Sequence, residues 1–237
     1  RTLDKWTANA WHGRSGGGMS DPGGYKSVAG VWLLAGAVGM ESAVRDFFEA
    51  MPWLPPVAFL YAQHVEPHEV QALTNKLQKA SRHLSCEVAL GRNWFNPGQM
   101  LVVPPGCRLD FGAQGEVVSL REPWGGRSAP HIDQLMMDLA GLMPPISGVI
   151  AFSGASTDGL QGARALHDMG IRVWAQDPVS AREPAMPRWV DKLRLASRVG
   201  SPAELAEEFL DLHPGSQPAV EGGAVAANDP QLETSSA

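Results

Sequence analysis

Five short stretches of the chain consist almost entirely of apolar residues and are bounded by polar or turn-forming residues. Continuous apolar runs of this kind are typical of strands that are covered on both faces, as in a parallel sheet. A helix would need a longer run with a repeat of 3.6 residues. The pattern therefore predicts buried strands at residues 31–34, 57–62, 100–103, 148–152 and 171–175.

Segments between these strands carry apolar residues at intervals of three and four positions, which is the pattern of an amphipathic helix. Helices are predicted on this basis around residues 43–51, 70–77 and 132–139, and a further helix at 159–169. A last helix begins after Ser201, where Pro202 and Glu204 complete a capping box with proline at the first helical position. Its buried face is expected to hold Leu205, Ala206, Phe209 and Leu210.

Alternating strands and helices predict an α/β fold with a doubly wound, mainly parallel sheet and helices on both faces. Residues 100–120 contain shorter strands separated by turns, which predicts a small antiparallel hairpin at the edge of the sheet. We assign residues 28–212 to this domain. Residues 1–27 and 213–237 are rich in glycine and other small or polar residues, and they are expected to be a flexible linker and a disordered tail.

Three candidate site residues, Ala37, His64 and Asp158, each follow the carboxyl end of a predicted strand. Such ends meet at one edge of a parallel sheet, so the three residues are expected to lie together. Residues 31–41 read as a strand, a turn of small residues and a helix. Hydrolases of several folds carry a serine nucleophile on such a turn, with backbone N–H groups aimed at the oxyanion. Here the nucleophile position is Ala37, whose methyl group cannot attack an ester.

Composition narrows the choice of partners and compartment. The net charge of −6 gives no indication of a nucleic-acid partner or an anionic membrane surface. Cys86 and Cys107 lack the spacing of a metal or redox site. No apolar run approaches the roughly 18 residues of a membrane-spanning helix, and none resembles the core of a signal peptide. The sequence is therefore expected to be that of a cytoplasmic protein without membrane insertion.

The order of the motifs along the chain is informative. After the 31–41 turn come Gln63 and His64, the Asn-Pro-Gly at 96–98, the Pro-His-Ile-Asp at 130–133, the loop 153–159, and Gln176 with Met186 and Pro187 further on. In this order and at these spacings they resemble the C-terminal effector domain of the chemotaxis protein-glutamate methylesterases, the CheB family. The resemblance covers roughly residues 28 to 212 and is that of a divergent member.

The resemblance implies a catalytic triad and its substrate. In the family a serine attacks glutamate methyl esters on the helical cytoplasmic stalk of chemoreceptors, a histidine transfers the proton and an aspartate orients the histidine. His64 and Asp158 match this pattern, and Ala37 stands in place of the serine. Val38 and Met40 also depart from the family pattern, and Met40 is expected to crowd the start of the helix. The family needs no cofactor and no metal.

Other interpretations of these residues remain open. His64 could be a structural hydrogen-bonding residue, and Asp158 could cap the helix at 159–169. Ser153 and Ser156 lie close to Asp158 along the chain and are alternative nucleophiles, although neither is on the turn. Ser42 lies about 7 Å further along the helix axis than the turn, which is too far for the same proton relay.

His64 and His68 are four residues apart and Glu69 is adjacent to His68, a spacing that could also place metal ligands on one face of a helix. The end of a strand is expected between the two histidines, so they need not share a face, and no metal is predicted. Arg45, Arg92 and Arg127 are candidates for docking a substrate or partner, and the sequence equally fits ordinary solvated surface residues at these positions.

Three functional hypotheses follow. The favoured one is a catalytically impaired module that binds a methyl-accepting chemoreceptor cytoplasmic domain or another chemosensory signalling protein. The second is an active or weakly active methylesterase, and the third is a pocket that binds a small ligand. Family members commonly carry a receiver domain ahead of the esterase domain. Residues 1–27 are too few to form one, so either the protein lacks it or the sequence is a piece of a longer chain.

Overall fold

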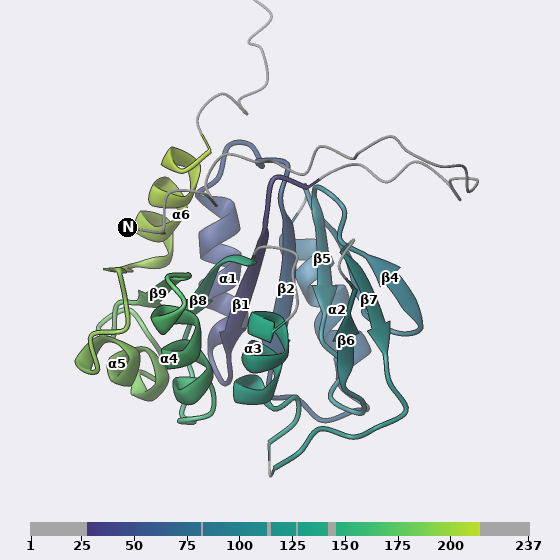
Figure 1. Cartoon of the computed structure of the whole chain (residues 1–237). Coiled ribbons are helices and arrows are strands. Elements are labelled where there is room, and N and C mark those ends of the chain that lie inside the picture. The colour runs from purple at the N-terminus through teal and green to yellow at the C-terminus, as the bar shows by residue number, and fades with distance from the viewer. Residues whose placement is uncertain (1–27, 82, 113–114, 127, 142–145, 214–237) are drawn as a thin grey trace, which may run out of the picture.

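A seven-stranded parallel sheet forms the centre of the computed structural model (Figure 1), with the strand order β10-β9-β8-β1-β2-β5-β3. The structure describes residues 28–81, 83–112, 115–126, 128–141 and 146–213. The strands of this sheet are β1 (Val31–Gly36), β2 (Ala58–Gln63), β3 (Ser85–Val88), β5 (Gln99–Val102), β8 (Ile146–Ala151), β9 (Arg172–Gln176) and β10 (Arg198–Gly200). The five strands predicted from apolar runs are all present, with bounds that differ by one or two residues.

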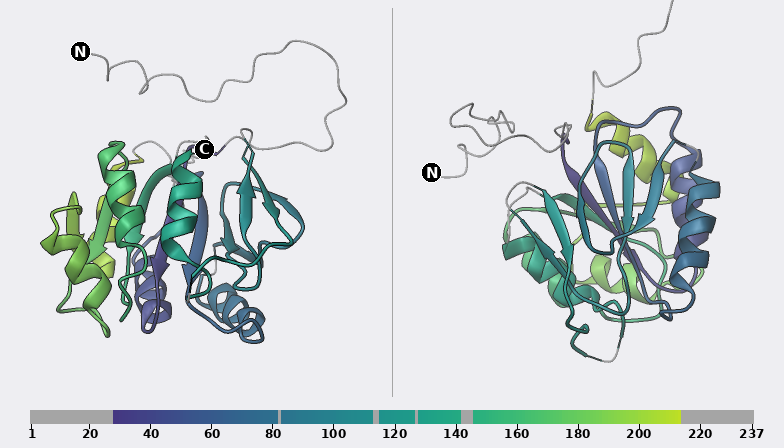
Figure 2. Two further views of the ribbon diagram at one scale, coloured as in Figure 1. Left: turned by 60° about the horizontal axis from the view of Figure 1, so that its bottom comes forward. Right: turned by 90° about the vertical axis from the view of Figure 1, so that its right-hand side faces the viewer.

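Helices cover both faces of the sheet, as the right-hand view of Figure 2 shows. One face packs against α1 (Met40–Glu49), α2 (Val70–Ala80) and α6 (Pro202–Asp211). The other face packs against α3 (Ile132–Gly141), α4 (Leu160–Asp168) and α5 (Ala185–Lys192). The predicted doubly wound α/β fold is therefore confirmed. Within the described residues, no helix is both long and apolar enough to cross a membrane.

β1 shows why continuous apolar strands suit this architecture. All six of its residues are buried, because its side chains alternate between the two helical layers. Trp32 faces the layer of α6, where its ring lies 5.2 Å from Phe209 and 4.8 Å from Trp174. The same ring fills the space beside Gly148 on β8, where a Cβ atom would lie 2.5 Å from the indole. Glycine at this position lets the large ring sit flat on the sheet.

The hairpin predicted within residues 100–120 forms between β6 (Leu109–Phe111) and β7 (Glu116–Ser119). Among the described residues, neither strand of the hairpin pairs with a strand of the large sheet. Instead, β7 also pairs with β4 (Arg92–Trp94), and the three strands make a separate antiparallel sheet. This small sheet joins the core on the side of α3, where Phe95 stacks on Phe111 at 6.3 Å between ring centroids.

Several elements lacked a clear sequence signal. The edge strand β3 alternates between exposed and half-buried residues, so it has no apolar run. β10 has only three residues. The eight-residue helix α5 contains Pro187, and two further prolines, Pro178 and Pro184, precede it in the sequence. The capping box of α6 was predicted correctly, because Ser201 Oγ accepts from Glu204 N and the Glu204 carboxylate accepts from Ser201 N.

The site is fixed by the strand order. β1 lies between β2 and β8, and the chain runs outward from β1 in opposite directions through these two neighbours. This makes the carboxyl end of β1 a topological switch point, where the flanking loops diverge and leave room for a site. Ala37, His64 and the loop that carries Asp158 follow β1, β2 and β8 respectively.

Candidate functional site

Ala37 occupies the corner between β1 and α1. Its N–H donates to Ser153 O at 2.9 Å, and its carbonyl accepts from Met40 N at 3.1 Å, which closes a tight turn. Gly39, at the N-cap of α1, has φ of +88°, a left-handed conformation that favours glycine. Ala37 is 7% exposed. The predicted strand-turn-helix corner is therefore present, with a methyl group at its tip.

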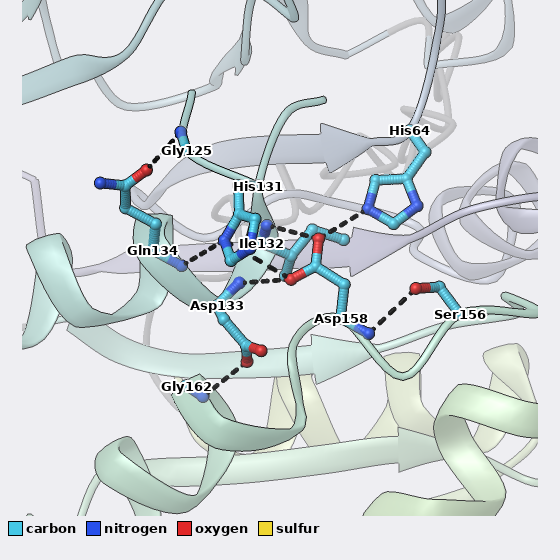
Figure 3. A network of polar contacts seen from close by, with 9 residues as sticks. All are labelled: His64, Gly125, His131, Ile132, Asp133, Gln134, Ser156, Asp158 and Gly162. Atoms are coloured by element: carbon cyan, nitrogen blue, oxygen red, sulfur yellow. Dashed lines mark hydrogen bonds and ion pairs between the residues drawn. The ribbon is translucent and has the colours of Figure 1, made fainter. Parts of the chain in front are cut away.

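His64 lies beside this corner. Gly36 and Gln63 are paired residues of β1 and β2, so Ala37 and His64 occupy the next position past the end of each strand. Figure 3 shows the imidazole directed at Asp158, with 2.8 Å between His64 Nε2 and Asp158 Oδ2. The side chains are 19% and 9% exposed, respectively. An ionised carboxylate only accepts hydrogen bonds, so Nε2 carries the proton and Nδ1 of the neutral ring is left as an acceptor.

Asp158 is held by the first turn of α3 as well as by His64. Its Oδ2 accepts from Ile132 N and its Oδ1 from Asp133 N, each at 2.9 Å (Figure 3). Burial by itself would raise the pKa of Asp158, but the hydrogen bonds from His64 and from the two N–H groups outweigh it and lower the pKa. The carboxylate therefore stays ionised and fixes the orientation of the imidazole.

This contact corrects one alternative from the sequence. Asp158 directly precedes α4 but does not cap it, since the N-cap residue of α4 is Gly159 and no side chain caps there. Asp133 of α3 supplies a carboxylate to α4 instead, with Oδ1 accepting from Gly162 N at 2.8 Å. Burial raises the pKa of Asp133 despite this hydrogen bond. Asp133 had no assigned role in the sequence, although an acidic residue in the first turn of a helix was its signal.

His131 belongs to the Pro-His-Ile-Asp motif at 130–133, and its side chain caps the start of α3. It directly precedes α3, and its Nδ1 accepts from Gln134 N at 3.1 Å. The same nitrogen is 3.8 Å from Asp158 Oδ1. A nitrogen that accepts from an N–H group has no proton to donate, so His131 does not compete with His64 for the carboxylate. Gln134 Oε1 accepts from Gly125 N at 3.1 Å and anchors the loop ahead of α3.

The two alternative serine nucleophiles have structural partners. Ser153 is completely buried, and its Oγ donates to Val38 O at 2.7 Å and accepts from Glu183 N at 2.9 Å. It thereby ties the turn after β1 to the loop before α5. Ser156 Oγ accepts from Asp158 N at 2.9 Å. Among the described residues, His64 is hydrogen-bonded to Asp158 and to neither of these hydroxyls.

Met40 does not lie where the sequence predicted. It was expected to crowd the start of α1, but its side chain is fully buried in the core between α1 and the sheet. Its sulfur would be 3.0 Å from a Cβ atom at Gly36, so it packs underneath the turn. Val38 is the residue that faces outward here, with 53% of its surface exposed.

The arrangement has two parts of a proton relay, an imidazole and a carboxylate that orients it. His64 can take up a proton at Nδ1 while Asp158 stabilises the imidazolium that results. The side chain at the tip of the corner, Ala37, is a methyl group and has no proton to give up. Among the described residues, no group of three or more His, Cys, Asp or Glu side chains could hold a metal ion. Arg127, one of the candidate docking cations, lies outside the described residues.

The family model described as CheB methylesterase matches residues 32–209. Two curated relatives from Myxococcus xanthus are named protein-glutamate methylesterase/protein-glutamine glutaminase 1 and 4. They are 28% and 29% identical over 186 and 188 residues, which cover 75% and 79% of this chain. These matches cover 54% and 53% of the relatives, so the chain spans about half their length.

Among solved structures, the CheB methylesterase catalytic domain of Thermotoga maritima has the same fold. It superimposes with a TM-score of 0.70 at 21% sequence identity, and the match covers 78% of this chain and all of that one. The likeness supports the arrangement of strands and helices described above.

Proposed function

This chain belongs to the CheB methylesterase family, and on that premise we propose that it is a catalytically impaired chemosensory domain. It docks onto the cytoplasmic part of a methyl-accepting chemoreceptor, or onto another signalling protein of the same pathway, without hydrolysing methyl esters at a useful rate. The related proteins act, by name, on protein glutamate esters and glutamine amides. The proposed partner is therefore a protein that carries such side chains.

The observation that carries this proposal is the His64–Asp158 pair beside Ala37. The pair has the 2.8 Å contact that a proton relay needs, and Ala37 lies at the adjacent strand end with no hydroxyl. In a serine hydrolase the loss of the nucleophile removes a factor of about 10⁶ in kcat, and oxyanion stabilisation and binding leave about 10³–10⁴ over water. A domain of this kind keeps the ability to bind but loses nearly all turnover.

Weak esterase activity is a second candidate, and one feature favours it. The imidazole of His64 is 19% exposed and has an unprotonated Nδ1 in its neutral form, so it can activate a water molecule as a general base. Residual hydrolysis by this route depends on His64 and not on a serine. A His64→Ala variant would therefore abolish it, whereas Ser153→Ala and Ser156→Ala would leave it unchanged.

Binding is tested directly by co-sedimentation with receptor signalling particles. A methylated chemoreceptor cytoplasmic fragment assembled on vesicles is expected to carry the protein into the pellet, and His64→Ala to sediment to the same extent. The second result is expected because docking depends on a surface larger than one imidazole. A protein that stays in the supernatant at every receptor concentration contradicts the proposed function.

A further inference from the structure

We propose that the groove between α1 and α2 is the docking surface for an acidic helical segment of the protein partner. This inference rests on the proposed function, since it says where and by what chemistry that partner binds. The two helices lie next to each other on one face of the sheet, and the right-hand view of Figure 2 shows that face at the side of the molecule.

The groove starts at Gly39, two residues after Ala37. It encloses about 730 Å³ and is lined by Gly39 at the turn after β1, by residues of α1 and α2, and by Arg182 from the loop before α5. Arg182 lies against the turn, since a Cβ atom at Gly39 would be 2.8 Å from Arg182 Cβ. A segment bound here therefore passes the turn that carries Ala37, as a partner presenting a side chain to the site must.

Charge favours an acidic occupant. Arg45, Lys76, Lys79 and Arg182 line the groove, against the two carboxylates Glu41 and Glu49. Glu41 is 3.5 Å from Lys76, and Arg45 is paired with Asp46 at 2.8 Å and lies 3.7 Å from Glu49. Exposed pairs of this kind contribute little to stability and are easily exchanged. Within the described residues, no ion pair is found for Lys79 or Arg182. A local excess of positive charge on a chain of net charge −6 marks this groove for a negatively charged partner.

The far end of the groove has a mixed lining, in which apolar side chains lie beside Glu49, Lys79 and His83. A second hollow of about 360 Å³ continues from it, sharing Glu49, Lys79 and Ala80 as lining residues. Phe48, Met51, Leu54 and Leu84 line this hollow, together with Ser81. Ser81 is 3% exposed, and within the part of the chain that the structure describes its hydroxyl has no hydrogen-bond partner. A bulky apolar side chain of the partner fits this end, while the acidic side chains lie over the lysines and arginines.

A helix is the shape that fits between two helices. Side chains of α1 and α2 form ridges, and a third helix packs its own ridges into the space between them. α1 has ten residues and so is about 15 Å long, which gives room for about three turns of a bound helix. The occupant is therefore an amphipathic segment with acidic residues on one side and an apolar residue near one end.

The test uses a 24-residue helical peptide of alanine and glutamate with one leucine near its end, titrated into the isotope-labelled protein at low salt. Amide shifts are expected along α1, α2 and around Arg182. The double variant Lys79→Glu/Arg182→Glu is expected to weaken binding at least tenfold. Its matched control is Arg164→Glu/Arg188→Glu on α4 and α5, which makes the same charge change on the opposite face and should bind within twofold of the unmodified protein.

A second variant keeps the charges and fills the groove. Ala80 lines both hollows, so Ala80→Trp is expected to block the peptide while circular dichroism shows an unchanged fold. The proposal is overturned if the peptide shifts α4 and α5, if a lysine-alanine peptide binds equally well, or if the double variant binds like the unmodified protein. It is equally overturned if no peptide binds.

Receptor binding separates this proposal from the proposed function. If receptor fragment sediments the unmodified protein and Lys79→Glu/Arg182→Glu alike, the groove is wrong and the receptor remains the partner. If the acidic peptide binds to α1 and α2 but receptor fragment does not sediment the protein, the groove stands and a different acidic protein is the partner.

Discussion

Asp158 and Asp133 hold the helices α3 and α4 together in a reciprocal way. Asp158 holds the first turn of α3, and Asp133 holds the first turn of α4. Asp158, directly before α4, accepts from two N–H groups at the start of α3, and Asp133 of α3 accepts from Gly162 N in α4. The first N–H groups of a helix have no acceptor within the helix, and the two carboxylates supply acceptors for them. One of these two carboxylates also orients His64, so the candidate site and the packing of α3 on α4 depend on the same contacts.

Replacing Asp158 by asparagine is expected to lower the free energy of unfolding by about 2–3 kcal/mol, because a buried, charged acceptor of three hydrogen bonds is lost. Urea denaturation measures this change. Asp168→Asn, at the exposed end of α4, is the matched control and should change stability by less than about 0.5 kcal/mol. Equal effects for the two variants would mean that Asp158 does not hold α3.

Acid should remove the stabilisation that Asp158 provides. Its pKa is lowered in the folded protein, so the contribution is fully present above the ordinary carboxyl pKa of about 3.9 and is lost as the pH falls through the folded value. The difference in unfolding free energy between the protein and Asp158→Asn should be constant from pH 7 to pH 5 and shrink below pH 4. A difference that grows towards low pH would contradict the lowered pKa.

Much of the fold could be predicted from the sequence, and the reasons are visible in particular elements. β1 is apolar along its whole length because helices cover both faces of the sheet. The start of α6 was predictable because Ser201 and Glu204 form a capping box. β3 and β10 were missed because an edge strand needs no apolar run. The separate sheet of β4, β6 and β7 could not be foreseen, since it depends on pairing between segments more than twenty residues apart.

The site was predictable only in part. Strand ends placed Ala37, His64 and Asp158 at one edge, which the structure brings together through the His64–Asp158 contact. The hydrogen bond from Gly162 N of α4 to the Asp133 carboxylate of α3 could not be predicted from the sequence, because the two residues are 29 positions apart. Local spacing also suggested that Met40 would obstruct the turn, and only the packing shows that it points into the core.

Ser153 is expected to act through structure alone. Its hydroxyl joins the turn after β1 to the loop before α5, and its removal leaves Glu183 N without this acceptor at a partly buried position. Ser153→Ala should lower the unfolding free energy by about 1–3 kcal/mol. Thr157→Ala, at an exposed position of the same loop, should change it by less than about 0.5 kcal/mol. A stable Ser153→Ala protein that loses residual ester hydrolysis would instead identify Ser153 as a nucleophile.

Introducing the missing hydroxyl should restore little activity. Ala37→Ser is expected to fold, since serine adds one atom at a position that is not completely closed. The N–H of residue 37 is already donated to Ser153 O, and the exposed Val38 offers no hydroxyl beside the new one. One missing oxyanion donor costs about 10²–10³ in rate, so less than a tenfold gain is expected from this single change. Gain is measured by the release of methanol from methylated receptor.

The most direct test of the account is the rate of methanol release from a methylated chemoreceptor fragment by the unmodified protein. The assay is run beside a family member that has serine at the position of Ala37, at equal concentration and saturating receptor. The account predicts a rate at least about a thousandfold below that of the serine-containing relative, with bound receptor still detectable. A rate within tenfold of the relative would contradict it and would show that the site hydrolyses esters without a nucleophile at Ala37.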